Sequence, residues 1–388
     1  MRAAALLRRW ALDAGFDRAG VATLEPSRHG EALRRWLERG EAASMAWMGR
    51  RVEDRLEPAS RLPGARSALC VALRYWPLEG EQEPEGDLWP RVARYARGED
   101  YHGLMERRLE ALGRRIAEAF PGTSWRRYVD TGPLLERELA ARAGLGVPGK
   151  HTCLLERDLG SWFLLGELLL TLDLEPDEPL ADLCGSCTLC LDSCPTGALV
   201  EPWRLDSNRC ISYWTIEHRG PLPAAARAMA GEWVFGCDIC QEVCPWNRRR
   251  SAEPAADHPE LRLPAERREL DLAGLLGLGR EDYVARFRGS PMKRARHEGL
   301  RRNAAVAMGN RGEERYAAPL ARALATDEDA TVRGHAAWAL GRIGGAAARA
   351  ALRAALAHEA DATVRSEIAA GLAADQVASE GAPRGTVR

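Results

Sequence analysis

The sequence predicts an α+β protein in three parts: a mixed α/β domain at residues 1–175, a cysteine-rich domain at residues 176–250 and an α-helical repeat domain at residues 251–380. Before residue 175, stretches with helical periodicity alternate with short apolar stretches typical of strands. Eight of the ten cysteines then lie between Cys184 and Cys244. Beyond residue 250 an alanine-rich motif returns at a constant interval, which indicates stacked repeats.

Helices and strands alternate in the first part. The patterns predict helices at residues 1–14, 29–39 and 101–120, and strands at residues 67–75 and 125–129. Pro133 suits the first turn of a further helix that runs to Gly144, because the missing N–H is no loss at that position. Residues 152–155 and 162–170 flank a polar turn, so we expect them to form a hairpin.

Charge and hydropathy indicate where in the cell the protein acts. The chain has 55 basic and 56 acidic residues, so any surface that attracts nucleic acid must be local. The most apolar stretch, residues 162–172, is interrupted by Glu167 and is too short to span a bilayer. Arg8 and Arg9 are not followed by the apolar stretch of an export signal. We therefore expect a cytoplasmic protein with no membrane contact, where clustered cysteines indicate metal binding more often than disulfides.

The first cysteine group has the spacing of a bacterial ferredoxin. Cys184, Cys187, Cys190 and Cys194 are separated by two, two and three residues, and Pro195 follows. In this run the first three thiolates hold one 4Fe-4S cluster and the fourth crosses to another. A zinc site is the alternative, but zinc usually joins two separated cysteine pairs. The spacing therefore predicts a ferredoxin-like domain.

The second cysteine group lacks its leading member. Cys237, Cys240 and Cys244 keep the expected spacing, but Val234 stands where the first cysteine should be, and Cys210 is the nearest replacement. The crossing rule then assigns one cluster to Cys184, Cys187, Cys190 and Cys244, and the other to Cys194, Cys210, Cys237 and Cys240. Cys70 and Cys153 lie in apolar strands, where we expect buried structural thiols.

A motif recurs every 32 residues in the third part, beginning at Leu300, Val332 and Val364. A period of this length with two helices per unit is typical of HEAT-like repeats, which bury their apolar faces against each other.

A local basic patch lies where the repeats begin. Residues 286–302 contain seven basic side chains and the single acid Glu298, and Arg333 and Arg365 continue the series at matching repeat positions. Such a patch can neutralise the phosphates of an RNA. For any one arginine, a solvated helical face or a salt bridge within the repeats is the alternative. The residues predicted to contact nucleic acid are Lys293, Arg294, Arg296, Arg301 and Arg302.

Asp130 ends the strand predicted at residues 125–129 and precedes a helix. Open α/β architectures often place functional side chains at such a point. Alternatively, Asp130 or Thr131 caps the helix that follows.

Taken in order, these motifs resemble the epoxyqueuosine reductase family. The resemblance rests on residues 184–199, 209–214 and 236–247, on residues 129–133, 136–138 and 142–146 upstream, and on the repeats downstream. It covers nearly the whole chain and is far more specific than the ferredoxin spacing alone.

The resemblance implies a cobalamin-dependent oxidoreductase of queuosine biosynthesis, a tRNA-processing pathway. Such an enzyme reduces epoxyqueuosine in a tRNA anticodon loop to queuosine, using cob(I)alamin fed with electrons by two 4Fe-4S clusters. The N-terminal domain would bind cobalamin, and the cluster of Cys194 would lie nearest that cofactor. The implied partners are the modified tRNA and an electron donor, and the implied oligomeric state is a monomer.

The resemblance also implies site residues. Asp130 would be the catalytic proton donor, a carboxylic acid shielded from water whose raised pKa suits it to protonate the oxyanion of the opened epoxide. The residues that match cofactor-contacting segments of the family are Arg55, Asp130, Leu154, Leu155, Glu156, Leu165 and Ser212.

Two other functions remain open at this point. One is a cobalamin-dependent enzyme similar to reductive dehalogenases, although those usually carry an export signal and lack repeats. The other is a ferredoxin-like electron carrier whose repeat tail docks a partner protein, which would bind no corrinoid.

Overall fold

The computed structural model describes residues 3–77, 86–248 and 258–380. By its internal contacts the chain forms two compact units. The first, here called the sheet unit, comprises Met1–Gln82, Gly98–Cys210 and Asp238–Arg262. The second, the repeat unit, comprises Glu83–Arg97, Ile211–Cys237 and Leu263–Arg388. The stretch predicted as one domain at residues 176–250 is thus divided between the two units.

The sheet unit contains all the strands of the described residues, together with eight α-helices. Its strands are β1 (Arg18–Thr23), β2 (Ser67–Arg74), β3 (Trp125–Tyr128), β4 (Val147–Pro148), β5 (Leu154–Leu155), β6 (Phe163–Leu170), β7 (Leu199–Glu201) and β8 (Arg204–Leu205). Its helices are α1 (Ala3–Asp13), α2 (Gly30–Glu38), α3 (Val52–Leu56), α4 (Tyr101–Ala119), α5 (Glu136–Arg142), α6 (Leu189–Asp192), α8 (Ile239–Glu242) and α9 (Pro245–Arg248).

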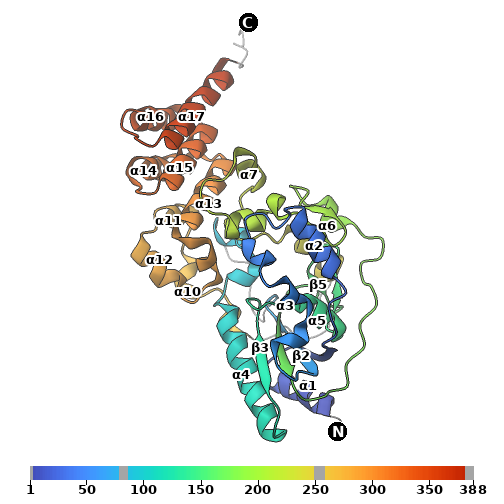
Figure 1. Ribbon diagram of the computed structural model, residues 1–388. Coiled ribbons are helices and arrows are strands. Elements are labelled where there is room, and N and C mark those ends of the chain that lie inside the picture. The colour runs from blue at the N-terminus through green and yellow to red at the C-terminus, as the bar shows by residue number, and fades with distance from the viewer. Residues whose placement is uncertain (1–2, 78–85, 249–257, 381–388) are drawn as a thin grey trace. The chain divides into compact units, whose positions relative to one another are not determined.

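A four-stranded antiparallel sheet in the order β1-β2-β6-β3 forms the centre of this unit. Helices α1 and α4 pack on one face and α5 packs on the other; α4 runs beside β3 in Figure 1. On the α5 face, Gly20 lies so close to the chain after α5 that a Cβ would come within 2.0 Å of the Ala143 carbonyl oxygen. Only glycine fits there, and the missing side chain brings α5 against the sheet.

The mixed α/β prediction is confirmed, with three local differences. The expected hairpin is wrong, because β5 pairs with β4 while β6 pairs with β2 and β3. The helix expected from Pro133 begins at Glu136. Strand β1 was not predicted, because its small residues, such as Gly20, produce no strong apolar alternation.

The described residues of the repeat unit form helices and connecting loops, with no strand among them. Its helices are α7 (Ala224–Met229), α10 (Ala265–Arg268), α11 (Leu272–Leu276), α12 (Arg280–Phe287), α13 (Arg296–Arg311), α14 (Ala317–Thr326), α15 (Ala330–Ile343), α16 (Gly345–Leu356) and α17 (Ala362–Glu380). Figure 1 shows α14 to α17 stacked in successive layers. The first residues of the recurring motif, Leu300, Val332 and Val364, are all buried. The prediction of HEAT-like stacking is confirmed. Among the described residues of either unit, no helix has the length and hydropathy needed to cross a membrane.

Candidate active site and cluster sites

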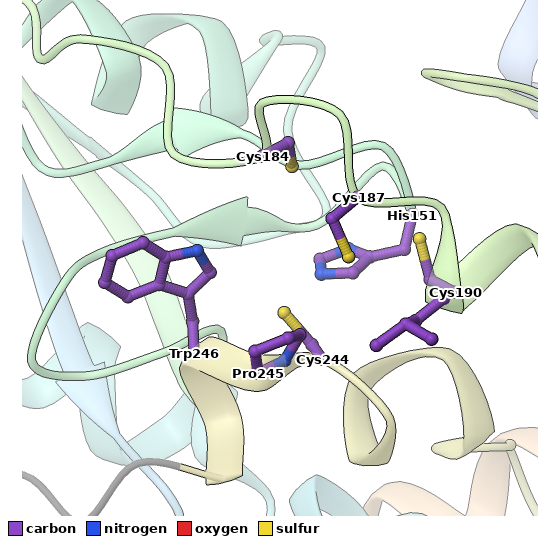
Figure 2. A pocket seen from close by; sticks show the side chains of 8 residues that line it. His151, Cys184, Cys187, Cys190, Cys244, Pro245 and Trp246 are labelled. Carbon is purple, nitrogen blue, oxygen red and sulfur yellow. The ribbon is translucent and has the colours of Figure 1, made fainter.

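Four cysteine sulfurs surround one cavity of the sheet unit. Cys184 and Cys187 lie on a loop, Cys190 lies on α6, and Cys244 immediately precedes α9. Figure 2 shows these side chains facing one another across the cavity. The loop is shaped by Asp182, whose carboxylate accepts hydrogen bonds from the backbone N–H groups of Cys184 and Gly185 at 3.0 Å each. The structure thus brings together the four cysteines that the crossing rule assigns to one cluster.

The other four predicted ligands are Cys194, Cys210, Cys237 and Cys240. Three of them belong to the sheet unit, while Cys237 is the last residue of a segment of the repeat unit. Cys194 is prepared to carry a negative charge. Burial raises its pKa, but hydrogen bonds from Thr196 and from backbone N–H groups outweigh burial and lower the pKa. The N–H of Ala198 donates to the Cys194 Sγ at 3.3 Å.

The remaining two cysteines lie outside these groups. Cys70 in β2 is fully buried, as expected for a structural thiol, and burial raises its pKa well above the usual value. Burial also raises the pKa of Cys153.

Lys150 and His151 belong to the surroundings of the first cavity, and nothing in the sequence pattern pointed to them. The Lys150 ammonium is buried and donates to the carbonyls of Gly185 and Cys187 at 2.7 and 2.9 Å. The His151 ring lines the cavity together with the cysteines in Figure 2. Its burial lowers the pKa to about 4, so the imidazole is neutral.

Asp130 lies just beyond the end of β3 with a positive φ of 55°. This left-handed conformation is uncommon for a residue other than glycine and marks a position worth a functional explanation. The side chain is 63% exposed, so the carboxylate is open to solvent and the expected shielding from water is not present here. Asp130 does not cap α5, because that helix begins six residues later and its N-cap, Leu135, makes no side-chain hydrogen bond.

Two side chains from the start of α4 face Asp130. The Tyr101 hydroxyl and the His102 Nε2 each lie 3.3 Å from the Asp130 Oδ2. His102 Nδ1 lies 2.6 Å from Asp100 Oδ1. Burial lowers the pKa of His102, but the hydrogen bonds to Asp100 and Asp130 outweigh burial and raise this pKa to about 9. At neutral pH His102 is therefore an imidazolium that lies between the carboxyl groups of Asp130 and Asp100.

Two further carboxyl groups lie close to Asp130. Glu167, in the middle of β6, is fully buried, and no N–H group of the described residues donates to either of its oxygens. The carboxyl group of Glu136 lies within hydrogen-bonding reach. Burial and the neighbouring Glu136 raise the pKa of Glu167 well above its usual value. Burial and Asp130 also raise the pKa of Glu136, to about 8. A buried carboxylate without donors is unfavourable, so protonation is the physical solution for Glu167.

The predicted cofactor residues do not all lie together. Leu154 belongs to an apolar cluster on the α5 face of the sheet, and Leu165 packs against it. Arg55 in α3 is close enough to Glu136 for their charges to interact. By contrast, Leu155 packs against Cys244 beside the first cavity, and Glu156 accepts from the N–H groups of the turn at residues 158–159. Ser212 belongs to the repeat unit, where it precedes the short π-helix Tyr213–Glu217.

The basic patch separates into buried and exposed members. Arg302 is only 2% exposed and donates to the carbonyls of Trp214, His218 and Gly220 and to the side chain of Asn303. Arg301 is mostly buried in an ion pair with Asp327. Both are part of the packing of the repeats, which corrects their prediction as RNA contacts.

The same pairing recurs at the next repeat position, where Arg333 binds Glu359. Arg365 donates to the carbonyls of Leu356 and Glu359. The series of arginines at repeat positions therefore stabilises the repeats.

Lys293, Arg294 and Arg296 lie on the surface. The structure adds Arg219, which is exposed and donates to the Arg294 carbonyl at 2.7 Å. Arg294 itself pairs with Glu217. Arg219 was missed because it lies 75 residues before Arg294 in the sequence.

Known families match three segments of the chain, and known proteins match most of its length. Residues 183–247 match the family described as 4Fe-4S double cluster binding domain, residues 55–131 match epoxyqueuosine reductase QueG, and residues 292–373 match HEAT repeats. The epoxyqueuosine reductase of Xanthomonas campestris is 41% identical over 85% of this chain and 93% of its own length. That of Escherichia coli is 38% identical over 78% of this chain and 80% of its own length.

Solved structures agree. A crystal structure of epoxyqueuosine reductase with an epoxyqueuosine-modified tRNA-Tyr stem loop has a TM-score of 0.87 at 31% identity, covering 96% of this chain and 98% of that one. The Bacillus subtilis enzyme, solved with an aspartate catalytic loop swung out of the active site, has a TM-score of 0.85 at 29% identity, covering 95% and 98%. From the sequence relatives and these structures together, the chain belongs to the epoxyqueuosine reductase family.

Proposed function

We propose that this protein reduces epoxyqueuosine in a tRNA anticodon loop to queuosine. The reaction takes up two electrons and two protons, breaks both C–O bonds of the epoxide and releases the oxygen as water. The observation that carries the proposal is the pair of Asp130 and His102 at the end of β3, where an exposed carboxylate adjoins a charged imidazole in a chain that also holds the cysteines for two clusters. An electron carrier would need the cysteines but not this pair.

Asp130 and His102 supply the protons in this proposal. The imidazolium of His102, held charged by Asp100, passes its proton through the Asp130 carboxyl group to the oxygen as the epoxide opens, which is general acid catalysis. The pair then takes up a second proton from solvent. A second transfer by the same route gives the second proton that converts the oxygen to water. Bound substrate would cover the carboxylate that is open here.

Part of the predicted cofactor set fits a corrin ring. Such a ring needs apolar contact and donors for its amide groups. Leu165, which is partly exposed and packs against the buried cluster that includes Leu154, provides the first. Arg55 provides the second, because its Nε is shielded from solvent and has no acceptor within the described residues. Bound cobalamin would supply a strongly reducing cobalt to the epoxide carbon. The Glu156 carboxylate already accepts hydrogen bonds from two N–H groups of the turn that follows it. We therefore do not include Glu156 among the residues proposed to contact cobalamin.

Two clusters held by the eight cysteines would supply the electrons. The cluster held by Cys194, Cys210, Cys237 and Cys240 is proposed as the nearer to cobalamin. An external low-potential protein would donate the electrons. The exposed basic residues Lys293, Arg294 and Arg296, together with Arg219, are proposed to contact phosphates of the anticodon stem loop. A tRNA substrate places the protein in the cytoplasm, where we propose that it acts as a monomer.

Reconstituted protein tests the function directly. The protein is supplied with iron, sulfide, cobalamin, a low-potential reductant and an anticodon stem loop carrying epoxyqueuosine, and the nucleosides are analysed by mass spectrometry. We expect queuosine to form and about eight irons to be bound per chain. Unchanged epoxyqueuosine with both clusters intact would contradict the proposal and favour an electron carrier.

A further inference from the structure

His151 points a polar atom into the cavity of the first four cysteines. Its side chain is buried, and its ring lies among Cys184, Cys187, Cys190 and Cys244 in Figure 2. Its Nε2 is shielded from solvent and has no hydrogen-bond partner within the described residues. Buried polar atoms are nearly always paired, so this atom requires a partner that belongs in the cavity.

The backbone determines which ring nitrogen carries the proton. The N–H of Cys153 donates to His151 Nδ1 at 3.1 Å. A nitrogen that accepts a hydrogen bond has no proton, so the proton of the His151 ring is on Nε2. His151 therefore presents an N–H donor, and not an acceptor, to the cavity.

A second positive feature lies in the same loop. The ammonium of Lys150 is fixed between the carbonyls of Gly185 and Cys187, next to two of the proposed cluster ligands. Reduction adds an electron to a cluster that is already surrounded by four thiolates. Hydrogen bonds to sulfur and nearby positive charge both stabilise that added electron, and both raise the reduction potential.

We propose that His151 donates its Nε2–H to a sulfur of the cluster held by Cys184, Cys187, Cys190 and Cys244, and thereby raises the reduction potential of that cluster. This inference rests on the proposed assignment of these four cysteines to one cluster. His151 is a tuning residue that touches neither tRNA nor cobalamin in this proposal. Its function is to make the cluster easier to reduce than four thiolates alone would allow.

Redox titration of two variants tests whether the N–H of His151 raises the reduction potential of the cluster. In His151→Phe the flat ring is kept and the donor is lost, whereas His151→Gln keeps an N–H. Both are titrated anaerobically, with reduced clusters detected by electron paramagnetic resonance. We expect the Phe variant to show about a tenfold lower ratio of reduced to oxidised cluster at fixed potential, which corresponds to about 59 mV for one electron. This shift should affect one cluster only, and the Gln variant should stay within about twofold of the unsubstituted protein.

An unshifted potential in the Phe variant, with about eight irons still bound, would overturn the proposal. So would a Gln variant that shifts as far as the Phe variant. Because the Phe variant could lose the cluster, a second measurement uses the unsubstituted protein. Pulsed resonance on the reduced protein labelled with ¹⁵N-histidine should detect coupling to one imidazole nitrogen, and this coupling should vanish in His151→Gln. No coupling in the unsubstituted protein would overturn the proposal.

Iron content separates this inference from the assignment beneath it. About four irons per chain in the fully reconstituted, unsubstituted protein would overturn the two-cluster assignment, and the inference with it. About eight irons with queuosine formation but no ¹⁵N coupling would overturn only the role of His151.

Discussion

The Nε2 of His102 lies 3.3 Å from the Oδ2 of Asp130, at the junction between the start of α4 and the end of β3. The two residues are 28 positions apart in the sequence, and the sheet brings them together. A charged imidazole beside an exposed carboxylate can deliver one proton at a time to a reaction that consumes two.

Replacing Asp130 by Asn should slow single-turnover formation of queuosine by about 100-fold or more, because a positioned general acid contributes at least that much. Binding of cobalamin and of the stem loop should be retained, since the amide has the size of the carboxyl group. Rapid-quench assays with spectroscopic measurement of cobalamin binding check both. Glu118, an exposed residue of α4, provides the control substitution Glu118→Gln. Unchanged turnover in Asp130→Asn would remove this residue from the mechanism.

The pH dependence of turnover should report His102. Its pKa is raised to about 9, so the proton is present at neutral pH and is lost as the pH rises through about 9. Turnover should fall on that alkaline side. In His102→Gln the alkaline limb should disappear and the rate at pH 7 should drop about tenfold, because reprotonation of Asp130 then depends on solvent. If turnover of the variant also falls at about the same pH, a group other than His102 is titrating.

The raised pKa of His102 also affects the stability of the folded protein. The paired imidazolium stabilises the folded state fully below the unfolded pKa of about 6.5. This stabilisation is lost as the pH rises through about 9. Nuclear magnetic resonance of labelled histidines should detect one ring with this high pKa, and that signal should be missing from His102→Gln.

Glu167→Gln should stabilise the protein at alkaline pH. The folded pKa of Glu167 is raised, so the folded state binds a proton that the unfolded chain releases above about pH 4.3, and stability declines as the pH rises from there. Glutamine removes this dependence while keeping the shape. We expect a melting temperature about 3 °C higher than that of the unsubstituted protein at pH 8, with little difference at pH 5. An equal effect at both values would contradict a protonated Glu167.

The basic residues should divide into two classes on substitution. Lys293→Ala and Arg296→Ala should leave the melting temperature unchanged, weaken stem-loop binding and reduce the salt slope of log affinity by about one each. Arg302→Ala should instead lower the melting temperature by several degrees, because it leaves three carbonyls without their donor. Fluorescence anisotropy at several salt concentrations, combined with thermal unfolding, distinguishes the classes. Normal stability of Arg302→Ala would return this arginine to the RNA surface.

Local spacing carried most of what the sequence could predict. The first three cysteines of the first run, Cys184, Cys187 and Cys190, lie within seven residues, so their shared cavity follows from the spacing along the chain. The repeat motif likewise reports burial at Leu300 directly. The roles of His102 and His151 could not be predicted from the sequence. Their partners depend on the strand order β1-β2-β6-β3 and on where α6 packs, and no short sequence pattern encodes either. Counting charges also failed to separate Arg302 from Arg296, since charge does not report which side of a helix is covered.

The hydrogen bonds of Arg302 make the helical repeats part of the packing of residues outside the repeats. Its guanidinium ties α13 to the carbonyls of Trp214, His218 and Gly220, and the neighbouring Asn303 ties the same helix to those of Thr215 and Val234. All five carbonyls belong to the stretch between Cys210 and Cys237. A gene truncated before α13 would therefore encode a chain in which these five carbonyls, all between two proposed cluster ligands, have lost their donors. Recombination that exchanged the helical repeats between relatives would have to exchange the residues between Cys210 and Cys237 as well.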